Sequence, residues 1–306
     1  MKKKWTVGTR GSKLALKQTE IVIQALKRLY PYNEFAMEFA VKIIKTTGDT
    51  VWDKPLYLIG GKGLFVKEIE DALLKNEIDM AVHSMKDLPT ELENGLVIGA
   101  ILEREDPRDV FISSTHGSIQ DITEGSRIGT SSMRRKSQLL HFRRGLEVVP
   151  LRGNVDTRIK KLHSHDLEGI ILAYAGVKRM GFDSFIKEVL PFEIMVPPSG
   201  QGAIGIETRD ESDSVKLLKP LNHKNTFREV IIERELQSMI GGGCQVPLGI
   251  NASITNNILT LHVVLGREDG ELLIKEMCIE DVVNAKDMMS RILGLIRDKQ
   301  KCLPNQ

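Results

Sequence analysis

The sequence predicts an α/β protein with two lobes and a cleft between them, followed by a small C-terminal α+β domain. Three observations predict this class. Short apolar strands alternate with helical stretches through the first two thirds of the chain, which favours α/β units with a mostly parallel sheet. The length of 306 residues suggests more than one domain. Alternating strands joined by Asn256-Asn257 and Asp269-Gly270 turns dominate the last part.

The first lobe begins with a strand over 5–9 and a helix that Ser12 is expected to cap and that Pro31 ends. A strand over 35–43 follows, then a long loop-like stretch over 46–63. The remaining segments before the first break are a helix over 64–76 and strands over 79–83 and 96–102. Charges and a proline at 103–107 break this pattern, so a domain crossing is predicted there.

The second lobe continues the alternation until a break at Pro197-Pro198-Ser199-Gly200. Its predicted strands lie at 109–112, 127–130, 148–151 and 169–173, and its predicted helices at 131–143 and 154–162. A strand at 203–207 follows the break. The last domain is predicted to comprise a helix at 226–239, strands at 250–254, 259–265 and 272–279, and a helix at 282–298.

Composition gives no support for several classes of protein. The net charge of +2 gives no general case for nucleic-acid binding. The three cysteines, Cys244, Cys278 and Cys302, show no CxxC spacing and no histidine at metal-site spacing, so neither a disulfide framework nor a metal site is expected. No apolar segment follows the basic start, and no apolar run is long enough to span a bilayer. A cytoplasmic protein without membrane contact is therefore expected.

Cys244 is the cysteine whose setting predicts exposure. It follows Gly241-Gly242-Gly243 and precedes Pro247, so the loop can take unusual backbone angles and cannot join a central strand. Cys278 lies within an alternating strand and Cys302 in a polar tail. Taken alone, the loop is more typical of a tight turn that carries an incidental thiol.

Arginines gather where a ligand is expected in the second lobe. Arg134 and Arg135 start a helix after a Gly-Thr-Ser-Ser loop, where basic groups oppose the helix dipole. Arg152 directly follows a strand, and Arg158 comes one helical turn later. These are carboxyl ends of strands, where α/β sheets bind ligands. Since guanidinium suits carboxylate or phosphate, a polyanion site is predicted; a solvated charged helix face is the alternative.

Two further stretches join this prediction. Gly8-Thr9-Arg10-Gly11-Ser12 resembles Gly129-Thr130-Ser131-Ser132, and both precede helices whose N-termini could bind anions. At the end of the strand over 79–83, Lys86 could bind an anionic group and Asp87 could stabilise a developing cation. A surface turn capped by Asp87 is the alternative, and His83 is expected to be structural.

Taken together, these motifs resemble those of the hydroxymethylbilane synthase family, also called porphobilinogen deaminase. They come in that family's order, and the extra glycine before Cys244 is a small variation. The matching stretches are Gly8–Leu16, Gly60–Phe65, His83–Pro89, Gly129–Arg135, Leu151–Arg158 and Gly243–Pro247.

The resemblance implies a transferase of porphyrin biosynthesis, with a dipyrromethane cofactor bound through a thioether to Cys244. Its partners would be porphobilinogen and the growing polypyrrole chain, a polycarboxylate. The family's N-terminal lobes resemble periplasmic binding proteins, which implies lobes at 1–102 with 200–220 and at 103–199, and a C-terminal domain at 221–306. A monomer is expected.

The same resemblance implies a role for each matched residue. Asp87 would be catalytic and would stabilise a cationic azafulvene-like intermediate. The other cofactor-binding residues would be Lys86, Ser132, Arg134, Arg135 and Arg158, and the substrate-binding residues Arg10, Ser12, Arg152, Gln201, Lys62 and Phe65. Lys62 and Phe65 fall in or beside the long loop, a possible lid.

Two other classes fit less well. A solute-binding protein would carry a secretion signal and would leave Cys244 and Asp87 without a role. A nucleic-acid binder would place aromatic side chains among the arginines, where the basic segment has Phe142 alone.

Overall fold

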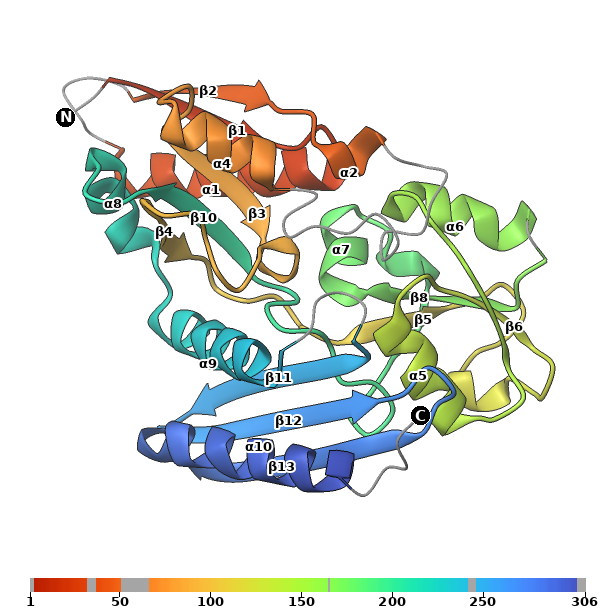
Figure 1. Ribbon diagram of the computed structural model, residues 1–306. Coiled ribbons are helices and arrows are strands. Elements are labelled where there is room, and N and C mark those ends of the chain that lie inside the picture. Colours follow the sequence, from red (N-terminus) through yellow and green to blue (C-terminus); the bar gives the residue numbers. More distant parts are fainter. Residues whose placement is uncertain (1–2, 32–36, 51–65, 165, 242–245, 302–306) are drawn as a thin grey trace. The chain divides into compact units, whose positions relative to one another are not determined.

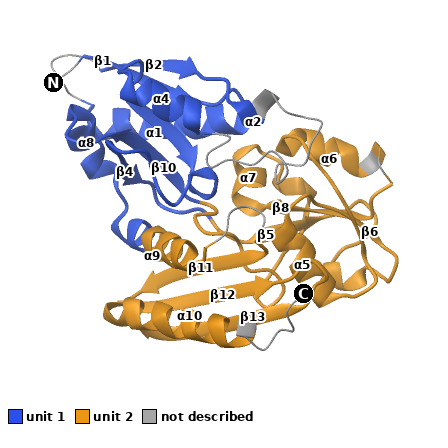
Figure 2. Cartoon of the chain, viewed as in Figure 1, with its two compact units in different colours: residues 1–105, 203–228 blue, residues 106–202, 229–306 orange. Residues whose placement is uncertain are grey.

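The computed structural model describes residues 3–31, 37–50, 66–164, 166–241 and 246–301 (Figure 1). The chain divides into two compact units (Figure 2). Unit 1 contains residues 1–105 and 203–228, and unit 2 contains residues 106–202 and 229–306. The chain therefore leaves unit 1, returns to it near residue 203, and leaves it again. The three-domain boundaries drawn from the sequence stay a prediction.

Unit 1 is built on a five-stranded sheet of order β2-β1-β3-β10-β4. Its strands are β1 (Lys4–Thr9), β2 (Glu38–Ile43), β3 (Met80–Ser84), β4 (Leu96–Ile101) and β10 (Ile204–Arg209). Its helices are α1 (Lys13–Leu29), α2 (Thr47–Thr50), α4 (Lys67–Leu74) and α8 (Asp213–Leu218), with 3-10 turns η1 (Met85–Asp87) and η4 (Lys219–Leu221). Val22 and Leu26 on α1 are buried in one core with Trp5 and Met80 of the sheet. This burial follows the apolar stripe of the helix.

Unit 2 contains a second five-stranded sheet, of order β7-β6-β8-β5-β9, and a three-stranded sheet of order β11-β12-β13. The strands of the larger sheet are β5 (Asp109–Ile112), β6 (Arg127–Gly129), β7 (Glu147–Val149), β8 (Gly169–Ala173) and β9 (Ile186–Val189). The helices that accompany them are α5 (Met133–Phe142), α6 (Val155–Ser164) and α7 (Tyr174–Arg179), with 3-10 turns η2 (Ile119–Asp121) and η3 (Asp183–Phe185).

The C-terminal part packs helices on an antiparallel sheet. Its strands are β11 (Leu248–Thr255), β12 (Ile258–Gly266) and β13 (Leu272–Asp281), followed by η5 (Val282–Asn284) and α10 (Ala285–Lys301). Met288 and Ile292 of α10 share a core with Leu261 of β12 and with Leu236 of α9 (Lys224–Ile240). The predicted fold class, two α/β sheets and a small α+β part, is confirmed by these elements.

The expectation of mostly parallel sheets is confirmed, since four of the five strands in each larger sheet share one direction and one strand in each is antiparallel. In unit 1, β10 runs antiparallel to both β3 and β4, while β1 is parallel to its two neighbours. In unit 2, β5 runs antiparallel to both β8 and β9. β5 is the first strand after the chain enters unit 2, and β10 is the first strand after it returns to unit 1. Neither strand is joined to the preceding strand of its own sheet by a crossover helix, which is the connection that makes neighbouring strands parallel. Strand-helix alternation predicts only the connections within one unit.

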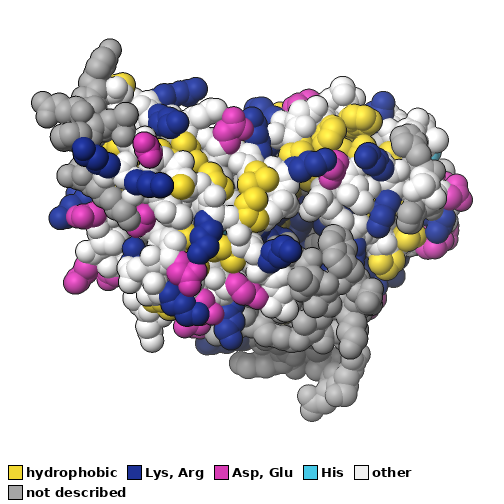
Figure 3. Space-filling model, turned by 90° about the horizontal axis from the view of Figure 1, so that it is seen from above, with side chains coloured by type: hydrophobic (Ala, Val, Ile, Leu, Met, Phe, Trp, Pro, Cys, Tyr) yellow, Lys and Arg dark blue, Asp and Glu magenta, His cyan; other side chains and the backbone are white. Residues whose placement is uncertain are grey.

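The apolar periodicity of the sequence did not identify some short elements. Helices α7 and α8 and strand β9 are short, and a window of a few residues shows too little of either period to identify them. Within the described ranges, no helix is long and apolar enough to cross a membrane. On the face drawn in Figure 3, Lys and Arg side chains are interspersed with acidic and uncharged ones.

Candidate active site

In unit 1, the N-terminus of α1 brings Arg10 and Ser12 to the end of β1. Ser12 Oγ accepts a hydrogen bond from the Ala15 N–H at 3.2 Å, which confirms the predicted N-cap. Arg10 is half-buried beside it. The first turn of α1 contains no acidic side chain, so the positive end of the helix dipole is not offset within that turn.

The turn η1 presents Lys86 and Asp87 to solvent at the end of β3. Both side chains are exposed, whereas Met85 and Leu88 on either side of them are buried. Ser84 Oγ lies 2.8 Å from the Gln18 side-chain nitrogen on α1, which ties the start of the turn to that helix. A buried residue on each side gives this acid–base pair a defined place although its own side chains are exposed.

His83 has a structural contact, as expected. Its Nε2 lies 2.9 Å from a carboxylate oxygen of Glu207 on β10, and both side chains are buried. Glu207 was not singled out from the sequence, because an acid in an apolar strand has no local signal for its partner, which lies 124 residues away.

Glu70 on α4 is a second buried acid that the sequence analysis missed. It is 4% exposed, and one of its carboxylate oxygens has no hydrogen-bond partner. Burial raises the pKa of Glu70 to about 7, and the negative charge of Glu207 adds to this shift. A hydrogen bond from the Glu93 backbone opposes it. Near neutral pH this carboxyl therefore binds a proton in a substantial fraction of molecules.

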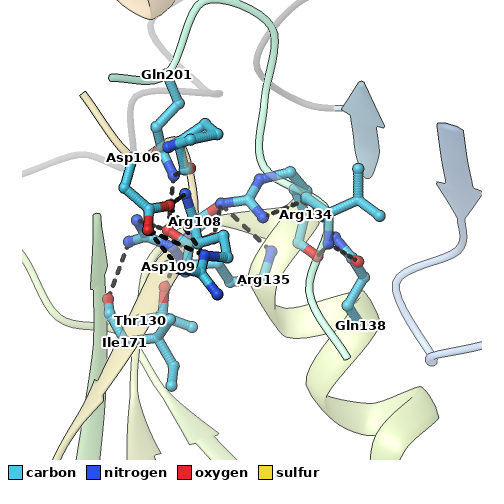
Figure 4. Close-up of polar contacts among 12 residues, drawn as sticks. Asp106, Arg108, Asp109, Thr130, Arg134, Arg135, Gln138, Ile171 and Gln201 are labelled. Atoms are coloured by element: carbon cyan, nitrogen blue, oxygen red, sulfur yellow. Dashed lines mark hydrogen bonds and ion pairs between the residues drawn. The ribbon is translucent and has the colours of Figure 1, made fainter. Parts of the chain in front are cut away.

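In unit 2, one buried carboxylate binds two arginines of the predicted site, Arg134 and Arg135 (Figure 4). Asp109, the first residue of β5, is fully buried. Its two oxygens accept hydrogen bonds at 2.7 Å, one from Arg134 and one from Arg135. Arg134 also donates to the Val196 carbonyl at 2.7 Å, and Arg135 to the Ile171 carbonyl at 2.9 Å.

Gln201 belongs to the same cluster. Its side-chain nitrogen donates to Asp109 at 3.0 Å and to the Pro107 carbonyl at 2.7 Å. Four residues that come from three separate stretches thus converge on one point of unit 2 (Figure 4). The sequence analysis placed Arg134 and Arg135 among the cofactor-binding residues and Gln201 among the substrate-binding residues. It missed Asp109, because an acid at the start of an apolar strand has no local signal for partners 25 or more residues away.

The charges of this cluster do not cancel. Two guanidinium groups against one carboxylate leave a net charge of +1, and Arg134 and Arg135 are only 5% and 6% exposed. Burial opposes ionisation of Asp109, but the two arginine charges and the hydrogen bonds outweigh it and hold the pKa of that carboxyl well below its usual range. Burial lowers the pKa of Arg134, and Arg135 adds to that shift. Arg135 Nε is buried without a hydrogen-bond partner.

Ser132 caps the helix that carries these arginines. Its Oγ lies 3.4 Å from the Arg135 backbone nitrogen, which donates to it, and its own N–H donates to Thr130 Oγ1 at 3.2 Å. The predicted similarity between the starts of α1 and α5 therefore holds at the level of the caps, because a serine occupies the same position in both.

Arg152 and Arg158 lie around the start of α6. Arg158 Nε donates to the Gly153 carbonyl at 2.7 Å, and Lys161 donates to the Arg152 carbonyl at 3.2 Å. Gly153 has φ of +121°, a conformation that residues with side chains rarely adopt. The glycine thus turns the backbone so that its carbonyl meets Arg158, in the first turn of α6.

Lys62, Phe65 and Cys244, which were predicted as site residues, lie outside the described residues. Among the residues that the structure describes, no group of three or more His, Cys, Asp or Glu side chains is arranged to hold a metal ion.

The chain was compared with known families and proteins. Residues 5–217 match the family domain described as "Porphobilinogen deaminase, dipyromethane cofactor binding domain". Residues 227–295 match "Porphobilinogen deaminase, C-terminal domain". Among solved structures, the methionine-binding protein MetQ matches over 76% of this chain and 94% of its own, with a TM-score of 0.43 and 12% identity. A similarity at that level supports no conclusion about this chain.

Curated relatives match along nearly the whole sequence. A porphobilinogen deaminase of Carboxydothermus hydrogenoformans is 49% identical over 276 residues, which cover 90% of this chain and 88% of the relative. One of Chloroherpeton thalassium is 45% identical over 293 residues, which cover 95% and 92%. The two family domains and these relatives show that the chain belongs to the porphobilinogen deaminase family.

Proposed function

We propose that the chain is a hydroxymethylbilane synthase that joins four porphobilinogen units into a linear tetrapyrrole and releases ammonia at each step. The observation that carries this proposal is identity of 45–49% over at least 88% of relatives named porphobilinogen deaminase. A dipyrromethane, bound as a thioether to Cys244, would supply the primer to which the units are added.

The Asp109 cluster fits a carboxylate-bearing group. Asp109 offsets one of the two guanidinium charges, so the cluster keeps a net charge of +1. It also leaves the buried Arg135 Nε without a hydrogen-bond acceptor. A carboxylate would offset both, since the planar guanidinium suits that group. Arg134 and Arg135 would therefore bind the carboxylates of cofactor and substrate, while Asp109 and Gln201 hold the guanidinium groups in place.

Asp87 is proposed as the catalytic carboxylate. The porphobilinogen ring becomes cationic as ammonia leaves, and a carboxylate near its pyrrole nitrogen favours the transition state over the bound substrate. Asp87 suits this role because its side chain is exposed, whereas its neighbours Met85 and Leu88 are buried. Lys86 beside it would attract the substrate carboxylates.

The remaining residues are assigned by the family motifs. Five of them would bind carboxylates of the growing polypyrrole chain or of the cofactor. These are Arg10 and Ser12 at the start of α1, Ser132 and Arg158 at helix starts of unit 2, and Arg152. Lys62 and Phe65 would belong to a lid. The protein is proposed to act as a cytoplasmic monomer.

Intact mass spectrometry of the purified protein tests this function. The mass should exceed that of the sequence by one dipyrromethane. Cys244→Ala should lose the excess, and Cys278→Ala should keep it. Cys278 is a matched control because it is half-buried on β13, and burial raises the pKa of its thiol, which disfavours the nucleophilic thiolate. An unmodified wild-type protein with full activity would exclude the covalent cofactor.

A further inference from the structure

The turn that carries Lys86 and Asp87 depends on how Met85 is seated. Met85 is 1% exposed and is the first residue of η1. Its N–H donates to the Ala203 carbonyl at 3.1 Å, and its own carbonyl accepts from the Leu88 N–H at 3.3 Å. Both backbone bonds of the turn therefore meet at Met85, and the exposed residues follow it directly.

Gly205, the second residue of β10, lies next to this side chain. It pairs with His83 of β3 on one side and with Ile101 of β4 on the other. A Cβ atom at Gly205 would lie 2.0 Å from Met85 Sδ and 3.1 Å from its Cγ. The Met85 side chain is buried, so the close packing around it resists a movement of the sulfur.

We propose that Gly205 is a positioning residue for Lys86 and Asp87, because the absence of a side chain at Gly205 leaves the space in which Met85 fixes the turn. This proposal rests on the proposed function, in which Asp87 acts on the substrate. Gly205 has no side chain that could act on the substrate, so its role is to let Met85 place Lys86 and Asp87.

The size of the effect follows from the contact distance. Ordinary contacts of a Cβ begin at 3.4 Å, so a methyl group at Gly205 would displace the Met85 sulfur by about 1.4 Å or push β10 by as much. The Ser84 end of the turn is tied to Gln18 of α1, so the displacement should be transmitted forward to Lys86 and Asp87. A misplacement of roughly 1 Å can lower a rate by about 10²-fold.

The test is a double-mutant cycle of Gly205→Ala and Met85→Ala, assayed by single-turnover elongation on cofactor-loaded protein. Gly205→Ala should lower the rate by about 10²-fold in the wild-type background. In the Met85→Ala background, which lacks the three side-chain atoms nearest to the added methyl group, the same change should alter the rate by less than about threefold. Gly99→Ala on β4 of the same sheet is the matched control, because the closest atom to a Cβ there is in the Leu218 side chain of α8, at 2.7 Å, and none of the three nearest atoms belongs to η1. It should stay within about threefold of wild type.

A second measurement does not depend on activity. The amide chemical shifts of Lys86 and Asp87 should move in Gly205→Ala and return toward the Met85→Ala values in the double variant. If the shifts behave so while Asp87→Asn elongates normally, the positioning is right and the catalytic role of Asp87 is wrong. Equal losses of rate from Gly205→Ala in both backgrounds, or none in either, would overturn the proposal. If Gly205→Ala fails to fold, Met85→Ala must restore folding, and failure of the double variant also overturns it.

Discussion

Replacing Asp109 by Asn should destabilise the protein by about 3–5 kcal/mol, the usual cost of breaking a buried ion pair from one side. Asn keeps the shape but removes the charge that two guanidinium groups share at 2.7 Å. Its amide nitrogen would also face donors where the carboxylate accepts hydrogen bonds from Arg134, Arg135 and Gln201. Each such charged bond contributes roughly 1.5–3 kcal/mol, so losing part of the set is enough to reach that range.

Urea unfolding followed by circular dichroism measures this loss. Asp106→Asn is a matched control close by in sequence: Asp106 also pairs with an arginine, Arg108, at 2.6 Å, but the side chains are 22% and 40% exposed. That exposed pair should contribute at most about 1 kcal/mol. If Asp109→Asn costs no more than Asp106→Asn at equal m-value, Asp109 does not neutralise the buried arginines as described.

The pH dependence gives an independent check on Asp109. Its pKa in the folded protein lies below the ordinary 3.8, so its contribution to stability is present above about pH 4 and is lost as the pH falls further. The unfolding free energy of wild type should therefore decline more steeply below pH 4 than that of Asp109→Asn. Parallel profiles of the two proteins would contradict this assignment.

Further predictions concern two residues of unit 1. Asp87→Asn should fold and bind substrate but elongate about a thousandfold more slowly in single turnover, since a charge about 4 Å away at an effective dielectric of 20 contributes roughly 4 kcal/mol; a rate within a few-fold of wild type would make Asp87 a turn cap. Glu70 has a pKa raised from 4.5 to about 7, so its stabilising contribution is full below about pH 4.5 and is lost as the pH rises through 7. Glu70→Gln should thus gain up to about 3 kcal/mol relative to wild type between pH 5 and pH 8, measured by urea unfolding; an unchanged difference across that range would show that Glu70 stays ionised.

The elements that could be predicted from the sequence are those determined by residues close together in the chain. Strands such as Gly169–Ala173 and the cap of α1 at Ser12 follow from apolar periodicity and side-chain chemistry within a few positions. The Asp109 cluster and the His83–Glu207 pair could not be predicted in this way. Their partners lie 25, 26 and 124 residues apart, and only the folded sheets bring them together.

The close approach of Met85 to Gly205 is a further contact that could not be predicted from the sequence. A glycine inside a strand pattern indicates a close approach by another group. Nothing in the sequence says which group approaches Gly205. The family motif marks Lys86 and Asp87, but the glycine that holds their turn in place comes from the segment that returns to unit 1 after residue 202.

That return also sets the order in which the protein can fold during its synthesis. β10 lies between β3 and β4 and pairs with both, so the first 105 residues alone leave those strands without their shared neighbour. At about 5–20 residues per second, roughly 5–20 s pass between the emergence of residue 105 and that of residue 209. Throughout that interval the ribosome-bound chain carries unpaired strand edges, which makes the nascent sheet of unit 1 a natural client for chaperones.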